Sequence, residues 1–212
     1  MSKRCVGLVM IIIGISVMAA GLDMGGYNLW DNYRAGIQAD IALDAVVRYR
    51  EEWEEAVAED LNETQETQSE LVPDFEREMQ MLELDNHRYI GTVSIPVIDV
   101  ALPVQEDWSP ALLKTSPCRY MGSPYQGNLI ICAHNYTTHF GRLKNLLPGD
   151  EVIFTDVEGN EFRYAVGELE TLAGTAVEEM EIGAWDLTLF TCTPGGQMRV
   201  TVRCDLLEND AP

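Results

Sequence analysis

Basic residues are scarce in this sequence of 212 residues, in which 14 Lys and Arg stand against 35 Asp and Glu. The formal net charge of -21 at pH 7 repels a phosphate backbone and argues against a nucleic-acid partner. An acidic surface is compatible with calcium, but the chain has no D-x-D-x-D-G loop, so we predict no metal and no other cofactor. Hydrophobic residues make up 46% and charged residues 23% of the chain, which is typical of a globular protein.

Cysteines are also few, and they lack the spacing of a zinc site. The five are Cys5, Cys118, Cys132, Cys192 and Cys204. No two of them form a C-x-x-C pair, so a structural zinc site is not expected. Their odd number and scattered spacing do not fit a disulfide framework. We therefore expect at least one free thiol, and the sequence leaves the disulfide state of the others open.

Charged residues are absent from positions 6–22, VGLVMIIIGISVMAAGL. As a helix this run would span roughly 26 Å, close to the ~30 Å hydrocarbon core of a bilayer. Because Lys3 and Arg4 precede it, we predict a single-pass anchor with residues 1–5 in the cytoplasm and the rest outside the cell membrane. A secretory signal cleaved near the small residues 19–21 is the alternative. Both interpretations place the remainder of the chain outside the cytoplasm.

The rest of the chain divides by composition into four segments. Residues 23–62 have apolar positions at three- and four-residue steps and predict a helical stalk. Residues 61–70 are polar, and we interpret residues 63–86 as a linker or a possible lid and residues 208–212 as a tail. Residues 87–207 alternate short β-branched runs with turn residues, which predicts a mainly β fold: a compact barrel of seven or eight strands, with short helical stretches near 110–115.

The stalk and the barrel are each predicted from particular residues. The apolar positions that we interpret as the packing stripe of the stalk are Trp30, Tyr33, Ile37, Ile41, Val47, Trp53 and Val57. The runs that we interpret as strands are 89–96, 98–104, 128–134, 151–156, 161–172, 186–192 and 198–206.

Two of these predicted strands end in residues that suit covalent catalysis. His134 ends one run before a polar loop, and Cys192 ends another before the turn at residues 193–196. In the next run Arg199 and Arg203 alternate with apolar residues, and a hairpin would bring Arg199 beside Cys192. A thiolate attacks a carbonyl, an imidazole moves the proton and a guanidinium stabilises the oxyanion. The residues alone fit a small buried cysteine and a solvated arginine equally well.

Each of these residues has a rival nearby. His139 is the alternative base, but we prefer His134 because a strand end positions a side chain better than a loop does. Arg203 is the alternative arginine, roughly 6.6 Å further along the strand than Arg199. Cys132 lies on the same side of its strand as His134, and we interpret it as a buried structural cysteine.

Residues 188–192, TLFTC, resemble the T-L-x-T-C motif of sortases, the cell-wall transpeptidases of Gram-positive bacteria. The segment 133–135 is similar to the histidine segment of that family, and Arg199 follows Cys192 at the spacing of the family's arginine. Residues 93–100 are similar to its opening strands. The resemblance covers about residues 89–206 and implies a closed eight-stranded sortase barrel.

The resemblance also implies roles for the matched residues. It makes Cys192 the nucleophile, His134 the general acid/base and Arg199 the residue that stabilises the oxyanion and orients the substrate. Three neighbouring residues are assigned to substrate binding: Thr188, Thr191 and Asn135.

The implied reaction is cleavage of an L-P-x-T-G-type sorting signal through a thioacyl intermediate on Cys192. The acyl group is then transferred to an amine of the cell wall, such as lipid II or the peptidoglycan cross-bridge, or to a pilin lysine. A cysteine hydrolase or peptidase that uses the same site, and a non-catalytic barrel that binds wall peptides, are the alternatives.

We assign no sortase class, because the resemblances are mixed. His134 with Asn135 and the helical N-terminal segment resemble class B enzymes. Residues 93–96 and 191–194 resemble class C and class D enzymes. Residues 73–75, Pro-Asp-Phe, resemble the class C lid with the Asp-Pro order reversed.

Overall fold

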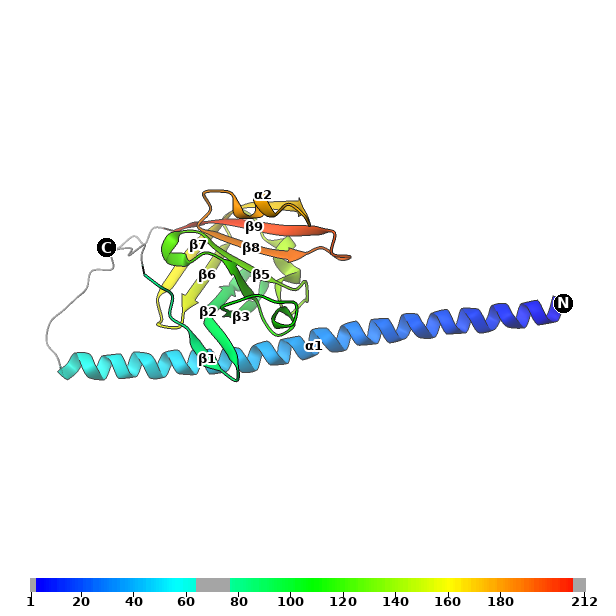
Figure 1. Ribbon diagram of the computed structural model, residues 1–212, viewed down its shortest axis with the longest axis horizontal. Helices are drawn as coiled ribbons and strands as arrows, with labels where there is room; N and C mark the ends of the chain where they lie inside the picture. Colours follow the sequence, from blue (N-terminus) through cyan, green and yellow to red (C-terminus); the bar gives the residue numbers. More distant parts are fainter. Residues whose placement is uncertain (1–2, 64–76, 208–212) are drawn as a thin grey trace. The chain divides into compact units, whose positions relative to one another are not determined.

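The computed structural model describes residues 3–63 and 77–207 of the chain (Figure 1). Its contacts divide the chain into two compact units, Met1–Arg34 and Ala35–Pro212. Residues 73–75, which resemble a lid, lie outside the described residues. The second unit contains every strand and all the predicted site residues.

The helices and strands follow the order that the sequence patterns predict, with two additional strands and one additional helix. The helix α1 spans Lys3–Glu63 and the helix α2 spans Val177–Glu181. The strands are β1 (Leu82–Leu84), β2 (His87–Ile95), β3 (Val100–Gln105), β4 (Cys118–Met121), β5 (Leu129–Ala133), β6 (Glu151–Asp156), β7 (Glu161–Ala173), β8 (Leu187–Cys192) and β9 (Met198–Leu206). The short 3-10 helices are η1 (Pro96–Ile98), η2 (Leu112–Lys114), η3 (Pro124–Gln126) and η4 (Phe140–Asn145). The strands β1 and β4 are absent from the runs predicted above.

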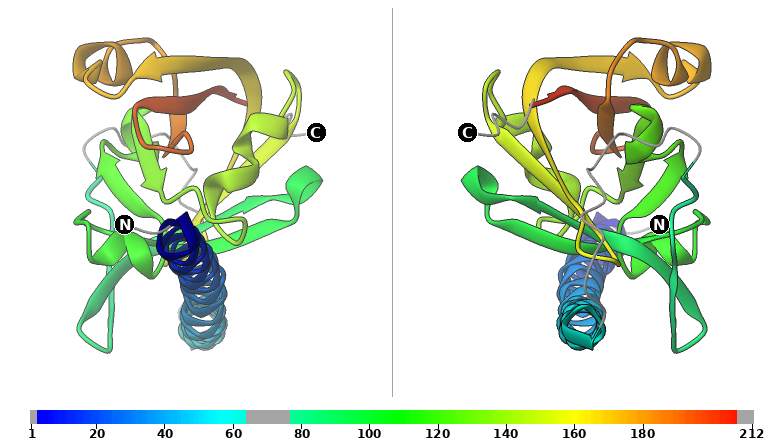
Figure 2. Two further views of the ribbon diagram at one scale, coloured as in Figure 1. Left: turned by 90° about the vertical axis from the view of Figure 1, so that its right-hand side faces the viewer. Right: turned by 90° about the vertical axis from the view of Figure 1, so that its left-hand side faces the viewer.

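Eight of the nine strands within residues 3–63 and 77–207 form a closed barrel. The order of neighbours is β2-β3-β4-β5-β8-β9-β7-β6, and β6 pairs again with β2. The short β1 adds to β2 outside this ring. Most neighbours are antiparallel, but β3 with β4 and β5 with β8 are parallel. Figure 2 shows the strands wrapped around a common interior. The prediction of a closed eight-stranded barrel is confirmed.

Alternation along the strands separates an inner from an outer face of the barrel. On β8, Leu187 and Leu189 are fully buried in the main hydrophobic core, as are Leu129 and Ile131 on the adjacent β5. The intervening residues, Cys192 among them, therefore point to the outer face. The inner face holds the barrel together by burying apolar surface, and the outer face of β5, β8 and β9 is left to build the site.

The helix α1 is continuous from Lys3 to Glu63, so no break separates the predicted anchor at 6–22 from the predicted stalk at 23–62. A candidate membrane span lies within Met10–Ala58, near the N-terminus, and by length and composition it can cross a bilayer. The large apolar residues between positions 10 and 30 are exposed in this helix, as expected of a segment that contacts lipid rather than a protein core.

The predicted packing stripe of the stalk is wrong. Ile37 and Ile41 are 41% and 65% exposed, whereas the buried hydrophobic residues of α1 in the second unit are Ala35, Ala39, Ala42 and Val46. Small residues face the barrel because the helix lies close to it: a Cβ added to Gly36 would be 2.9 Å from Cγ2 of Thr138. The helix packs with the face that carries small side chains, because these allow a close approach to the barrel. The prediction relied on side-chain hydrophobicity alone and therefore chose a different face.

Candidate active site

Three adjacent strands carry the predicted catalytic residues at one end of the barrel. The parallel pair β5 and β8 aligns Ala133 with Thr191, so His134 follows β5 at the level where Cys192 ends β8. The antiparallel pair β8 and β9 places Arg199 directly opposite Cys192. The hairpin register that the sequence predicts is the one the structure has.

These three residues line one groove of about 270 Å³ on the outer face of the barrel. His134, Cys192 and Arg199 are all half-buried, so each remains accessible from the groove. The other lining residues are Trp108, Leu113, Tyr120, Cys132, Ala133, Ala173, Gly174, Ala176, Val177, Met180 and Phe190. Most of this lining is apolar, which favours an extended peptide with apolar side chains and strengthens electrostatic interactions at the cysteine.

Aromatic side chains form one wall of the groove. Trp108 stacks on Tyr120 with ring centroids 5.8 Å apart, and Tyr120 meets Phe190 edge-on at 5.4 Å. Phe190 lies two residues before Cys192 and shares its face of β8, so this wall begins beside Cys192. Sequence reasoning missed Trp108 and Tyr120, because they come from the loop after β3 and from the unpredicted strand β4.

Arg199 is held by the turn that follows Cys192. Its Nη1 donates to the carbonyl oxygens of Gly196, at 2.8 Å, and of Met198, at 3.1 Å. Gly195 and Gly196 have φ values of 90° and 75°, a left-handed conformation that suits glycine. In the part of the chain that the structure describes, every side-chain hydrogen bond of Arg199 runs through Nη1. Its Nε and Nη2 are thus available to a substrate oxygen.

Arg203 has a different environment from Arg199. It is 3% exposed, and its Nε donates to Oε1 of Glu170 at 2.8 Å. Its Nη1 donates to the Met180 carbonyl at 3.0 Å, and its Nη2 donates to the Glu179 carbonyl at 2.6 Å. Arg203 therefore fastens α2, which supplies the Met180 side of the groove, and it does not line the groove itself. This geometry supports the preference for Arg199 as the site arginine.

The two threonines assigned to substrate binding have partners inside the protein. Thr191 is 3% exposed, and its Oγ1 donates to the Ala133 carbonyl at 2.8 Å. Thr188 is 2% exposed, and its Oγ1 accepts from Nη1 of Arg203 at 3.0 Å. Neither hydroxyl is presented to the groove, so their contact with substrate stays a prediction. Asn135 is exposed beside His134, so burial does not keep its side chain away from a substrate.

His139, the rival base, is fully buried. Burial, together with the nearby His134 and in spite of a backbone contact with Ala35, lowers the pKa of His139 from 6.5 to about 4. Tyr136 lies between the two imidazoles, with centroid distances of 5.0 Å to His134 and 5.3 Å to His139. His139 is therefore a neutral packing residue at physiological pH. It lies outside the groove, whereas His134 lines it.

A sortase-domain family model matches residues 93–207, which is more than half of the chain. The chain belongs to the sortase family. Sortase A of Bacillus anthracis is 26% identical to it over 190 residues, 85% of each protein. Membership supports a sortase-type transpeptidase, since that is what the family's characterised members are.

Two solved sortase structures support the same fold. Sortase C1 of Streptococcus agalactiae has a TM-score of 0.54 at 22% identity, covering 79% of this sortase and 90% of that chain. Sortase C of Streptococcus pneumoniae has a TM-score of 0.53 at 24% identity, covering 80% and 95%. Because the relatives carry the names of both sortase A and sortase C, they do not single out a class.

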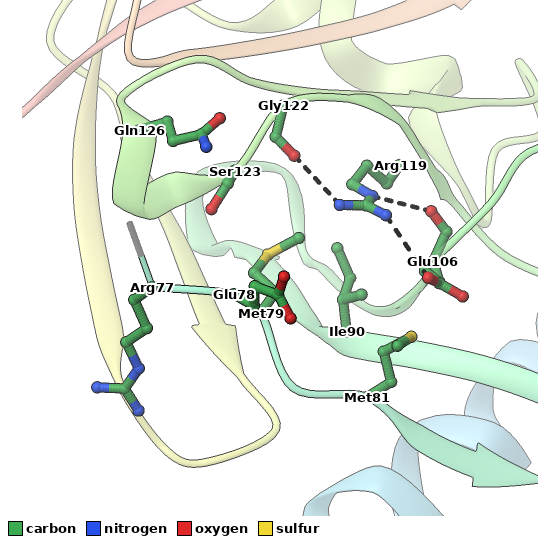
Figure 3. A pocket seen from close by; sticks show the side chains of 10 residues that line it. All are labelled: Arg77, Glu78, Met79, Met81, Ile90, Glu106, Arg119, Gly122, Ser123 and Gln126. Atoms are coloured by element: carbon green, nitrogen blue, oxygen red, sulfur yellow. Dashed lines mark hydrogen bonds and ion pairs between the residues drawn. The ribbon is translucent and has the colours of Figure 1, made fainter. Parts of the chain in front are cut away.

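A larger cavity of about 520 Å³ lies at the other end of β5 and contains none of the predicted site residues. Figure 3 shows Arg119 pointing toward Glu106 and the Gly122 carbonyl, with Met79 and Ile90 forming an apolar side. The Nε of Arg119 donates to the Glu106 carbonyl at 3.0 Å. The lining residues of this cavity include no cysteine and no histidine.

Proposed function

We propose that this sortase cleaves a sorting-signal peptide with Cys192 and transfers the acyl group to an amine. The observation that carries the proposal is the meeting of Cys192, His134 and Arg199 at three adjacent strand ends in one groove. A buried structural cysteine would not require an arginine directly opposite it and a histidine beside it. The arrangement is the one that thiol acyl transfer needs.

In the first half-reaction the Cys192 thiolate attacks the scissile carbonyl carbon. The negative charge that develops on the carbonyl oxygen is stabilised by the Nε and Nη2 groups of Arg199, whose Nη1 is bonded to the turn. His134 then donates a proton to the departing amine as the C–N bond breaks. A thioester on Cys192 remains, and the product with the new amino terminus leaves.

In the second half-reaction an acceptor amine attacks this thioester. His134 takes the proton from the incoming nitrogen, and the C–S bond breaks to restore the Cys192 thiolate. An L-P-x-T-G-type signal fits the apolar groove, because Trp108 and Phe190 offer surfaces for the leucine and proline side chains. The acceptor that we propose is an amine of the cell wall or a pilin lysine.

The candidate membrane helix would determine on which side of the membrane the reaction takes place. A helix that is long and apolar enough to cross a bilayer precedes the barrel in the chain. With Lys3 and Arg4 on the cytoplasmic side, the barrel would face the outside of the cell. Substrate and acceptor would then both be available at the outer surface of the membrane.

Transfer and hydrolysis are separated by the fate of the thioester. Residues 27–212 would be incubated with an L-P-x-T-G-like peptide, with and without an amine, and the products analysed by mass spectrometry. We expect the amide product with amine, slower release of the acid without it, and loss of both in His134→Ala. Release of acid alone from the cognate substrate and acceptor would identify a hydrolase.

A substrate-like electrophile tests for catalysis as such. A peptide carrying a thiol-reactive group in place of the scissile bond should modify Cys192, and the adduct should be absent from Cys192→Ala. Reversible binding without any adduct would favour the non-catalytic wall-peptide-binding barrel.

A further inference from the structure

Three cysteines lie in a row across the strands beneath the groove. Cys118 on β4 is the register partner of Cys132 on β5. Cys132 is aligned with Phe190 on β8, two residues before Cys192. Partners in a ladder share a face of the sheet, as do residues two apart on one strand, so all three sulfur atoms are on the outer face.

The spacing distinguishes the two neighbouring pairs. Direct partners in an antiparallel ladder have Cα atoms about 4.5 or 5.5 Å apart, and both values lie inside the ~4.4–6.8 Å range of disulfides. Cys132 and Cys192 are diagonal, separated by one strand spacing of ~4.8 Å and a rise of ~6.6 Å. Their Cα atoms are then about 8 Å apart, too far for a bond without backbone movement. Cys118 and Cys132 are the pair that the register brings into range.

Burial favours the protonated form of these two thiols. Cys118 is fully buried and Cys132 is 3% exposed. Burial is the main cause that raises the pKa of both thiols, that of Cys132 to about 12, and the neighbouring Cys132 raises the pKa of Cys118 further. Cys132 nevertheless lines the groove beside Cys192. In its reduced form it is a second thiol next to the site of the thioester.

We infer that Cys118 and Cys132 form an intramolecular disulfide that bridges β4 and β5 in the exported protein. Two S–H bonds break and one S–S bond forms, while a disulfide oxidant outside the cell is reduced to two thiols and takes up both protons and both electrons. The structure holds the reduced partners, with both cysteines as free thiols.

The bond would have a consequence for the groove. Among the residues that the structure describes, Cys192 and Cys132 are the two thiols that line it. Once Cys132 is bonded to Cys118, Cys192 is the remaining thiol, and an acyl group on its sulfur cannot move to Cys132. The bond itself does not depend on the proposed catalysis, and its test contains no activity measurement.

Peptide mapping of the full chain tests the bond directly. The protein is extracted from membranes of aerated cells in detergent, with an alkylating agent and no reductant, and digested with trypsin. Cleavage after Lys114, Arg119 and Arg142 puts Cys118 in peptide 115–119 and Cys132 in peptide 120–142. We expect these two peptides to be linked and to separate on reduction. The peptides 164–199 and 204–212, which hold the other two cysteines of the barrel, should carry the alkyl group.

Thermal unfolding of variants gives a second, independent measurement. The disulfide would close a loop of about 15 residues, so reductant should lower the Tm of the full chain by roughly 6–12 °C. Reductant should have no such effect on Cys118→Ala. The matched control is Cys204→Ala, since Cys204 is equally buried but faces Leu187 and Val166 across its two ladders. This variant should keep the full shift. Alkylated Cys118 and Cys132, or a link between Cys132 and Cys192, would overturn the inference.

Discussion

Acidification is expected to destabilise the barrel through His139, whose ring is fully buried. The pKa of this histidine falls from 6.5 to about 4 in the folded protein. Between these two values the unfolded chain binds a proton that the folded chain does not, so stability falls as the pH falls. The difference of about 2.5 units, at about 1.4 kcal/mol each, corresponds to about 3 kcal/mol. This contribution of His139 to the free energy of unfolding is fully present above pH 6.5 and is lost by about pH 4.

The assay compares denaturant unfolding of residues 27–212 with that of His139→Met across this pH range. Methionine fills irregular apolar space and cannot become charged. The carboxylates titrate in both proteins, so the difference between the two pH profiles isolates the histidine. We expect the free energy of unfolding of His139→Met to fall by about 3 kcal/mol less than that of the unchanged protein. If the pH profile of His139→Met coincided with that of the unchanged protein, the burial argument for His139 would be refuted.

The remaining predictions concern the groove and its support. Cys192→Ala should abolish peptide cleavage at an unchanged Tm, whereas Cys204→Ala should retain turnover. Arg199→Lys should lower kcat/KM by about 10²–10³-fold, because lysine lacks the planar fork that meets the oxyanion. Arg203→Lys should instead lower the free energy of unfolding by about 1–3 kcal/mol, through weakened bonds to Glu170 and to α2, with a smaller loss of turnover. A reversal of the two arginine effects in the same assays would mean that Arg203 serves the site.

The meeting of Cys192 with Arg199 could be predicted because its information is local. The run at 186–192 is a short strand pattern, and a glycine turn follows it directly, so the pairing of Cys192 with Arg199 depends on a few consecutive residues. The position of His134 at the end of an apolar run is equally visible in the sequence. The prediction that His134 lies beside Cys192 came from the family resemblance. The sequence pattern alone could not give it, because the parallel pairing of β5 with β8 joins residues far apart in the chain.

The features that escaped prediction depend on distant partners. The strand β4 has four residues between turn-forming segments, and it exists because it pairs with β5. The helix α2 has five residues, and Arg203 fixes it from β9 through contacts with Glu179 and Met180. Neither has a hydrophobic period long enough to be recognised. The buried face of α1 was missed for the opposite reason, since its apolar period is clear but the packed face carries alanines.

The threonines of residues 188–192 explain why a short motif can specify this site. The hydroxyl of Thr191 donates a hydrogen bond to the Ala133 carbonyl. Thr191 directly precedes Cys192, and Ala133 directly precedes His134. A slip of one residue between β5 and β8 would break this bond and move the histidine to the wrong face of the barrel. The hydroxyl of Thr188 bonds to Arg203, which holds the groove wall in place. The motif thus fixes both the register and the wall around its cysteine, through one hydrogen bond from each threonine.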